Sequence, residues 1–256
     1  MKDDDEIIII RHNITTSNCF INLKNTSNFA YCDENDIIIF DYFENKLSYL
    51  KSHTDEILYL TQLKNENLIS CSKDTLIKIW DIKNKKCIIN LEGHEDWVNY
   101  IIELNENKIA SSSIDYSIRI WDIINYICLN ILKGHKDWVN CLVQINDKEI
   151  ASASDDYLIK FWNFETGEEK NIFFDCQNCV KFLVKIDDKN LLSIDNEGNI
   201  IIWDLKESNT IILKMEFERK DICNCYYLND ERISLITEDL KIYILNLNTQ
   251  TYFLLK

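Results

Sequence analysis

The feature that most constrains this chain is a period of 41 residues. The four histidines follow one another at this step, at His12, His53, His94 and His135. Four of the six tryptophans keep the same step, at Trp80, Trp121, Trp162 and Trp203. The other two tryptophans, Trp97 and Trp138, are again 41 residues apart. A regular period of this length predicts repeated structural units of one kind, each packed against its neighbours.

The last residues of each period form a short run rich in β-branched and aromatic side chains. The runs are DIIIFD (36–41), LIKIWD (76–81), SIRIWD (117–122), LIKFWN (158–163), NIIIWD (199–204) and LKIYILN (240–246). Such runs, bounded by Asn and Asp, predict β-strands. Within the period 87–122 we expect four strands, at 87–91, 97–104, 108–113 and 117–122. Four short antiparallel strands in about 40–45 residues are typical of a propeller blade, so six copies predict an all-β, six-bladed propeller.

The charge balance and the termini limit the kinds of partner and the compartment. The chain has 43 acidic and 28 basic residues, a formal net charge of −15, so nucleic acid and anionic membrane are not expected as partners. The first residues, MKDDDEIIII, do not resemble a secretory signal, and no apolar stretch is long enough to span a bilayer. Ten cysteines without a signal predict reduced thiols in the cytoplasm or the nucleus. We expect residues 1–256 to form one domain with a short acidic tail at 1–5.

Gly-His pairs at 93–94 and 134–135, followed by Trp-Asp at 121–122 and Trp-Asn at 162–163, resemble the WD-repeat family of β-propellers. The resemblance covers nearly all of residues 6–256 and is most specific in the three central copies. The chain departs from the family in its four glycines and in the missing Trp-Asp pair of the first and last copies. The resemblance implies a non-enzymatic scaffold without a cofactor, which binds a protein or peptide.

The resemblance also implies a hydrogen-bonded set of Trp, Ser, His and Asp in each complete copy. The sets are His53, Asp74 and Trp80; His94, Asp115 and Trp121; and His135, Asp156 and Trp162. The serine is either member of the pairs Ser70 and Ser72, Ser111 and Ser113, or Ser152 and Ser154, because alternate strand residues share a face. The fifth copy has Cys176 in place of the His, beside Ser193, Glu197 and Trp203. A constellation that occurs three times, with no G-x-S-x-G elbow, favours a structural network over a catalytic triad.

Trp97 and Trp138 have no place in these sets. In the family pattern, the residue between the Asp and the Val of Gly-His-x-Asp-x-Val lies on one rim of the central channel, and here these residues are Glu56, Trp97, Trp138, Cys179 and Asp221. The residues before each turn Asp, namely Lys73, Ile114 and Asp155, are rim positions too. Exposed Trp and Ile on neighbouring blades predict a docking patch, flanked by Glu95, Lys136 and Asp155. The alternative is that both indoles fold inward and cover the blade tops.

Two other functions belong to different classes of protein. A substrate-receptor subunit of a ubiquitin ligase is one, although the chain has no F-box-like region and no Trp-Asp-x-Arg sequence. The other is a metalloprotein, in which Cys176, Cys179, Cys223 and Cys225 on adjacent blades bind zinc.

The two ends of the chain supply one outer strand more than six blades need. EIIIIR (6–11) resembles the strand before each Gly-His, and QTYFLLK (250–256) resembles the strand after each Trp-Asp. We therefore expect one end to seal the ring by pairing beside the other end's blade. The sequence does not indicate which end does so, and it does not predict an oligomeric state.

Overall fold

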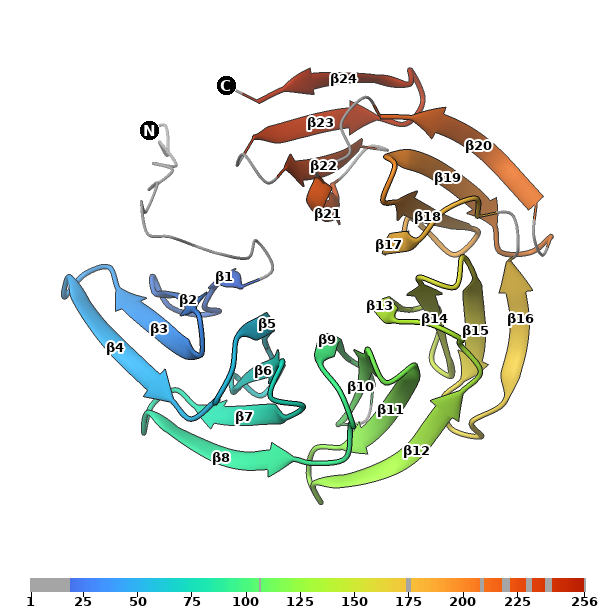
Figure 1. Ribbon diagram of the computed structural model, residues 1–256. Coiled ribbons are helices and arrows are strands. Elements are labelled where there is room, and N and C mark those ends of the chain that lie inside the picture. The colour runs from blue at the N-terminus through green and yellow to red at the C-terminus, as the bar shows by residue number, and fades with distance from the viewer. Residues whose placement is uncertain are drawn as a thin grey trace.

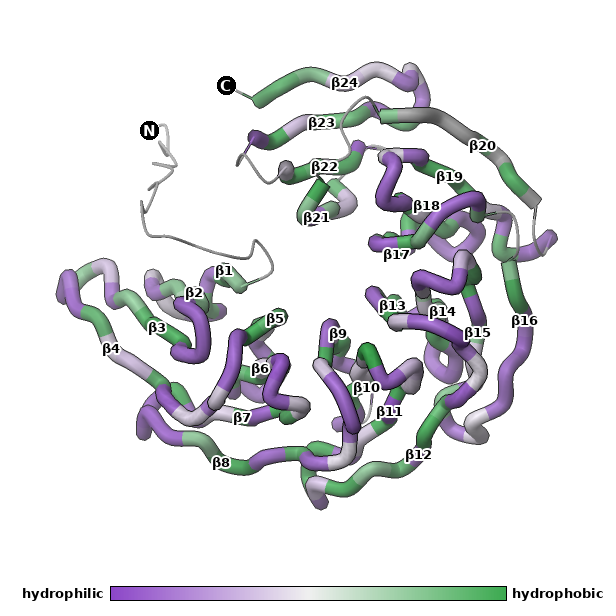
Figure 2. Tube along the Cα trace, viewed as in Figure 1, coloured by the Kyte–Doolittle hydropathy of each residue, from purple (hydrophilic) through white to green (hydrophobic). Residues whose placement is uncertain are grey.

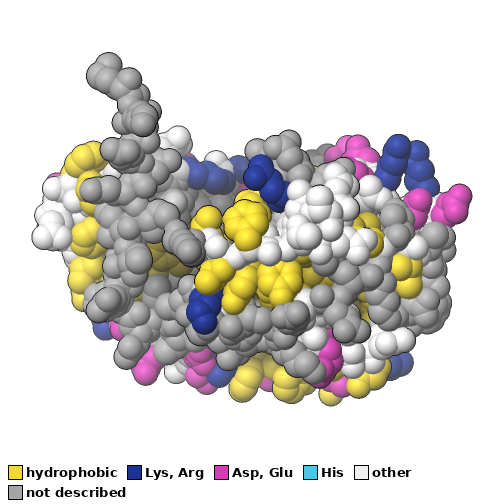
Figure 3. Space-filling model, turned by 90° about the horizontal axis from the view of Figure 1, so that it is seen from above, with side chains coloured by type: hydrophobic (Ala, Val, Ile, Leu, Met, Phe, Trp, Pro, Cys, Tyr) yellow, Lys and Arg dark blue, Asp and Glu magenta, His cyan; other side chains and the backbone are white. Residues whose placement is uncertain are grey.

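The computed structural model describes residues 19–105, 107–173, 176–207, 210–217, 222–228, 232–237 and 241–255. These residues form 24 strands in six four-stranded antiparallel sheets. Among them there is no helix, and hence none long and apolar enough to cross a membrane. The sheets follow one another around a central axis (Figure 1), and in the view turned by 90° the molecule is wider than it is high (Figure 3). The predicted all-β, six-bladed propeller is confirmed; the tail 1–5 lies outside the described residues.

Each blade consists of four strands that are consecutive in the chain. Blade one contains β1 (Phe20–Asn22), β2 (Phe29–Asp33), β3 (Asp36–Asp41) and β4 (Lys46–Lys51). Blade two contains β5 (Ile57–Gln62), β6 (Leu68–Ser72), β7 (Ile77–Asp81) and β8 (Lys86–Leu91). Blade three contains β9 (Val98–Glu103), β10 (Lys108–Ser113), β11 (Ser117–Asp122) and β12 (Ile127–Lys133).

The other three blades repeat this order. Blade four contains β13 (Val139–Gln144), β14 (Glu149–Ser154), β15 (Ile159–Asn163) and β16 (Glu169–Phe173). Blade five contains β17 (Val180–Lys185), β18 (Asn190–Asp195), β19 (Asn199–Asp204) and β20 (Thr210–Glu216). Blade six contains β21 (Ile222–Tyr227), β22 (Arg232–Thr237), β23 (Ile242–Asn246) and β24 (Thr251–Leu254). The first strand of each blade is nearest the axis and the fourth is outermost.

The sequence period and the blade are offset by one strand. The first strand expected in the period 87–122 is β8, which pairs with β7 and is the outer strand of blade two. The remaining three strands of that period are β9, β10 and β11 of blade three. Each period of the sequence therefore supplies the outer strand of one blade and the three inner strands of the next blade, and it joins the two blades covalently.

The core lies between the faces of neighbouring blades. Trp80, Trp121, Trp162 and Trp203 are almost completely buried. Between blades three and four, the indole of Trp162 packs in a cluster with Ile118, Ile120 and Leu142. Apolar residues occupy the strands of each blade, whereas hydrophilic residues gather at many connecting turns (Figure 2). Burial of one large apolar side chain contributes about 1.5–3 kcal/mol, so the repeated Trp and Ile positions account for much of the stability of each blade contact.

The predicted seal between the chain ends is not confirmed. Residues 251–254 form β24, which pairs with β23 as the outer strand of its own blade. In the described part of the chain, no sheet combines strands from the two ends. The other candidate, residues 6–11, lies outside the described residues, so its pairing remains a prediction.

Removal of residues 1–11 tests that prediction. If EIIIIR covers an outer edge, its loss should lower the melting temperature, by about 2–4 °C for each kcal/mol of pairing that is lost. Removal of residues 1–5 alone is the matched control, because it deletes the acidic tail and leaves the apolar run. Equal melting temperatures for both truncated chains would contradict the seal.

Candidate docking site at the channel rim

The rim is built on a hydrogen-bonded network inside each central blade. In blade three, the His94 Nδ1 lies 2.7 Å from Asp115 Oδ2, and its Nε2 lies 2.7 Å from Ser111 Oγ. The Trp121 indole N–H donates to the same Ser111 oxygen at 2.8 Å. Blades two and four repeat this geometry with distances of 2.7–2.8 Å, in sets formed by His53, Ser70, Asp74 and Trp80, and by His135, Ser152, Asp156 and Trp162.

The second serine of each pair has a different role. The Ser113 hydroxyl donates to the Asp96 carbonyl oxygen at 3.1 Å and accepts from the Asp115 N–H at 3.0 Å. Ser72 and Ser154 make the equivalent contacts in blades two and four. These serines therefore join the turn that carries the network aspartate to the segment that leads into the innermost strand of the blade.

The electrostatics of the network keep two of its histidines, His53 and His94, neutral. Burial lowers the pKa of His53 and of His94 and outweighs the opposite effect of their Asp partners. Burial would raise the pKa of Asp74, but hydrogen bonds from His53 and from the backbone lower it to about 2. The neutral imidazole with its proton on Nδ1 donates to the carboxylate and accepts from the serine, so every polar group is satisfied.

These pKa shifts predict a loss of stability in acid. The pKa values of His53 and His94 are lower in the folded chain than the ordinary 6.5, so the unfolded chain binds more protons below about pH 6.5 and stability falls there. The lowered pKa values of Asp74, Asp115 and Asp156 predict a second fall below about pH 4. Urea unfolding between pH 7.5 and 3 measures both falls in stability. The stability of the His94→Ala variant should decline less steeply between pH 7 and 5 than that of the unchanged chain. An unchanged midpoint from pH 7.5 to 5 would contradict neutral histidines.

Close packing favours the Gly that precedes the His in blades three and four, whereas Ser52 precedes His53 in blade two. A Cβ at Gly93 would lie 2.9 Å from the Arg119 guanidinium and 3.2 Å from the Trp121 ring, and one at Gly134 would lie 3.0 Å from the Trp162 ring. Gly93 also has a φ of 155°, which other residues rarely adopt. The Gly-His pair therefore brings the chain tightly over the buried indole.

Blade five keeps only part of the network. The Trp203 N–H donates to Ser193 Oγ at 2.8 Å. Cys176 takes the place of the histidine in this blade, and its side chain is buried. The turn that contains Glu197 is held by Asp195, which accepts from the Glu197 and Asn199 N–H groups at 2.9 Å. Asp195 stands 41 residues after Ser154, and the sequence reasoning did not single it out.

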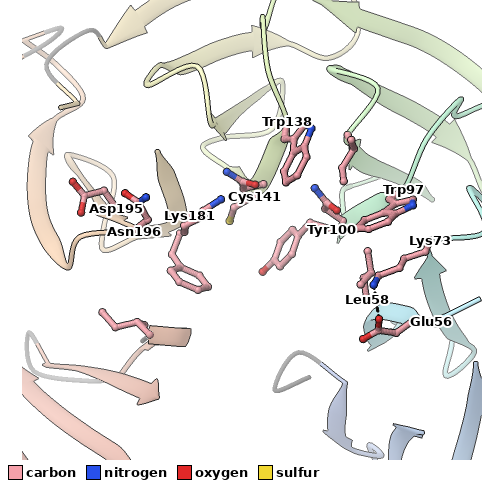
Figure 4. A pocket seen from close by; sticks show the side chains of 15 residues that line it. Glu56, Leu58, Lys73, Trp97, Tyr100, Trp138, Cys141, Lys181, Asp195 and Asn196 are labelled. Atoms are coloured by element: carbon pink, nitrogen blue, oxygen red, sulfur yellow. Dashed lines mark ion pairs between the residues drawn. The ribbon is translucent and has the colours of Figure 1, made fainter. Parts of the chain in front are cut away.

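A cavity of about 570 Å³ opens at the rim of the channel. Five of the residues expected at the docking patch line it: Glu56, Lys73, Trp97, Ile114 and Trp138. Trp97 and Trp138 come from neighbouring blades and border this one cavity (Figure 4). Their exposed fractions are 39% and 42%, whereas the following residues, Val98 and Val139, are fully buried. Successive residues at the start of a strand point to opposite sides, which places the indoles on the surface.

Two ion pairs border the apolar part of the cavity. Lys73 Nζ lies 2.6 Å from Glu56 Oε2 and 4.4 Å from the centroid of the Trp97 ring. Across blades four and five, Lys181 Nζ lies 2.8 Å from Asp155 Oδ1, which also accepts from Asn140 Nδ2 at 2.6 Å. The lysines that approach the cavity are thus already paired with carboxylates within the chain.

The remaining expected residues lie around the cavity rather than in its wall. Glu95 and Lys136 are exposed, and Asp155 is half-buried behind Lys181. Cys179 also lies outside the wall, with its Sγ 3.8 Å from the Asp155 carbonyl oxygen. Asp221 lies outside the described residues.

Several lining residues were missed by the sequence reasoning. Leu58, Asn99, Asn140 and Lys181 occupy one position of the 41-residue period, two residues after the rim position. Each stands at a register shift near the start of an innermost strand. Such a bulge turns one extra side chain away from the regular alternation. The 41-residue period indicates that these four positions are equivalent. It does not indicate the bulge that brings their side chains to the cavity.

In the described part of the chain, the two cysteine pairs are not arranged as a metal site. Within the described ranges, no group of three or more His, Cys, Asp or Glu side chains is arranged to hold a metal ion. Cys223 Sγ lies 3.2 Å from the Ile236 carbonyl oxygen, and burial raises the pKa of Cys225.

The fold defines a six-bladed β-propeller whose blades are joined by a 41-residue repeat. Residues 44–81, 85–122 and 126–163 each match the family model of the WD domain, G-beta repeat. These three stretches are WD repeats, and each spans the outer strand of one blade and three strands of the next. The expected resemblance to the WD-repeat family is confirmed. A comparison with curated proteins gives no match.

Proposed function

We propose that this propeller is a non-enzymatic scaffold that binds an extended peptide or a protein segment at the rim cavity, with Trp97 and Trp138 as anchors. WD-repeat propellers are in general protein-interaction scaffolds, and they typically bind proteins or peptides. The observation that carries the proposal is the exposure of two indoles, on neighbouring blades, beside one cavity of about 570 Å³. Tryptophan is enriched among residues that dominate binding energy, and large exposed apolar groups usually mark an interface.

The polar networks support a scaffold rather than an enzyme. Ser70, Ser111 and Ser152 are fully buried, and each oxygen already accepts a hydrogen bond from an indole. A nucleophile must reach the substrate, and these three serines are not among the residues that line the rim cavity. Their repetition in three blades is accounted for by the stability of the fold.

The remaining expectations stay proposals. The ten cysteines, which all lie in the described part of the chain, form no disulfide, which accords with a reducing compartment such as the cytoplasm or the nucleus. The overall charge of −15 favours protein over nucleic acid or anionic membrane. No observation favours the ubiquitin-ligase receptor over a scaffold of another pathway.

A differential capture experiment tests the proposed function. The full chain and its Trp97→Ala/Trp138→Ala variant would be compared as baits, with quantification of every captured protein. The matched control is Tyr42→Ala/Phe43→Ala, which removes two exposed aromatic side chains from the turn between β3 and β4. We expect at least one protein to be lost with the first variant and retained with the control. A set of captured proteins unchanged by the first variant would contradict docking at the rim.

A further inference from the structure

The turns at the cavity end of blades two to four carry an excess of negative charge. These turns are residues 52–56, 73–76, 92–97, 114–116, 134–138 and 155–158. Apart from the aspartates of the His–Asp networks, they contain seven acidic residues and two lysines: Asp55, Glu56, Glu92, Glu95, Asp96, Asp137 and Asp155, with Lys73 and Lys136. The segments between strands at the other end of the same blades are close to balanced, with Glu66, Glu106, Asp147, Glu165 and Glu168 against Lys64, Lys83, Lys85 and Lys148.

Internal ion pairs leave part of this charge uncompensated. Glu56 is paired with Lys73, and Asp155 with Lys181. Within the described part of the chain, no cationic side chain pairs with Glu95, Asp96 or Asp137. A partner that docks here therefore meets a negative potential, which favours positive charge on the partner.

The two indoles differ in what covers them. The Lys73 ammonium lies over Trp97, 4.4 Å from the ring centroid. The same positions, 41 residues later, are Ile114 and Trp138, and among the described residues no ammonium lies over the Trp138 ring as Lys73 lies over Trp97. Trp138 is 42% exposed and borders the same cavity as Trp97 (Figure 4). An indole face attracts a cation, and the chain itself shows one bound to the neighbouring indole.

We propose that the rim cavity binds a basic extended peptide, in which one Lys or Arg side chain stacks on the indole of Trp138. The carboxylates of Glu95, Asp96 and Asp137 supply the negative potential for the other basic residues of that peptide. The proposal rests on the proposed docking function and adds the chemistry of the partner.

The substitution Ile114→Lys tests the stacking directly. It places a lysine beside Trp138 at the position from which Lys73 reaches Trp97, so the protein's own ammonium should compete with the partner's. Ile114→Met is the matched control, because it places an unbranched side chain at this position, as lysine does, but one that is apolar and uncharged. We expect Ile114→Lys to weaken binding of basic peptides at least tenfold more than Ile114→Met does. Lys73→Met frees the Trp97 face and should strengthen binding about twofold.

The probe is a displayed library of random nonapeptides, selected on the full-length chain at low salt and then synthesised. We expect the selected peptides to be enriched in Lys and Arg, and their affinity to fall several-fold when the salt concentration is raised from 0.05 to 0.5 M. Glu95→Gln should weaken binding about two- to fivefold, as for an exposed charge pair. Glu44→Gln, which removes the same charge from the turn between β3 and β4, should not.

The outcomes separate this inference from the proposed function. Peptides that lose binding to Trp97→Ala/Trp138→Ala but show no excess of Lys and Arg would overturn the basic partner and leave rim docking intact. Equal binding of Ile114→Lys and Ile114→Met would also overturn the stacking. Peptides that bind the double tryptophan variant unchanged, or a selection that yields no peptide, would overturn both proposals.

Discussion

Replacing His94 with alanine is expected to lower the free energy of unfolding by about 1–3 kcal/mol. His94 is buried and makes hydrogen bonds to Asp115 and to Ser111. Its removal leaves the Asp115 carboxylate and the Ser111 hydroxyl without their partner in a region of low dielectric constant. The loss of a partner costs more than the loss of the bond itself, because the remaining groups were desolvated on folding. Urea unfolding at pH 7.5 measures the difference.

A double-mutant cycle identifies the cause of that loss. Ser111→Ala removes the group that joins His94 to Trp121, so the effects of His94→Ala and Ser111→Ala should not add. Glu95→Ala is the control for a change at the adjacent exposed position, and it should alter stability by no more than about 0.5 kcal/mol. Additive effects of the two network substitutions would mean that His94 and Ser111 are not energetically linked.

Replacing Trp97 with alanine is expected to weaken partner binding by about 2 kcal/mol or more, which is roughly a thirtyfold loss of affinity. The indole is 39% exposed at the mouth of the cavity, and its neighbour Val98 supplies the contact with the core. Stability should therefore change by less than about 1 kcal/mol, which includes the loss of the Lys73 ammonium from the ring face. Titration with a selected nonapeptide and thermal unfolding of the same sample measure both quantities.

Two further variants show what the Trp97 result means. Phe43→Ala removes an aromatic side chain that is 84% exposed in the turn between β3 and β4, and it should affect neither binding nor stability. Trp121→Ala removes a buried indole and should lower stability by about 3–5 kcal/mol. A Trp97→Ala chain that resembles Trp121→Ala, with lost stability and intact binding, would show that Trp97 is a packing residue.

Much of the architecture was predictable because the information is local and repeated. Runs such as NIIIWD specify a buried strand wherever they occur, and their spacing sets the number of blades. The offset between period and blade was not predictable in this way. Whether residues 87–91 pair forward with β9 or back with β7 depends on the path of the chain between blades, and the structure pairs them with β7.

The candidate site shows the same division. The sequence by itself determined the repeat, and with it the order of polar residues in each period and the adjacency of Trp97 and Trp138 around the axis. The tertiary structure alone decided that the indole N–H of Trp121 donates to Ser111 and not to Ser113. The strand register places Trp121 opposite Ile109, which is two residues from Ser111 and four residues from Ser113. It also decided that Asn99 and Lys181 line the cavity, through bulges, and that Lys73 covers Trp97. A repeat specifies which positions are equivalent, but contacts between equivalent positions depend on register, bulges and side-chain reach, which arise only when the blades pack together.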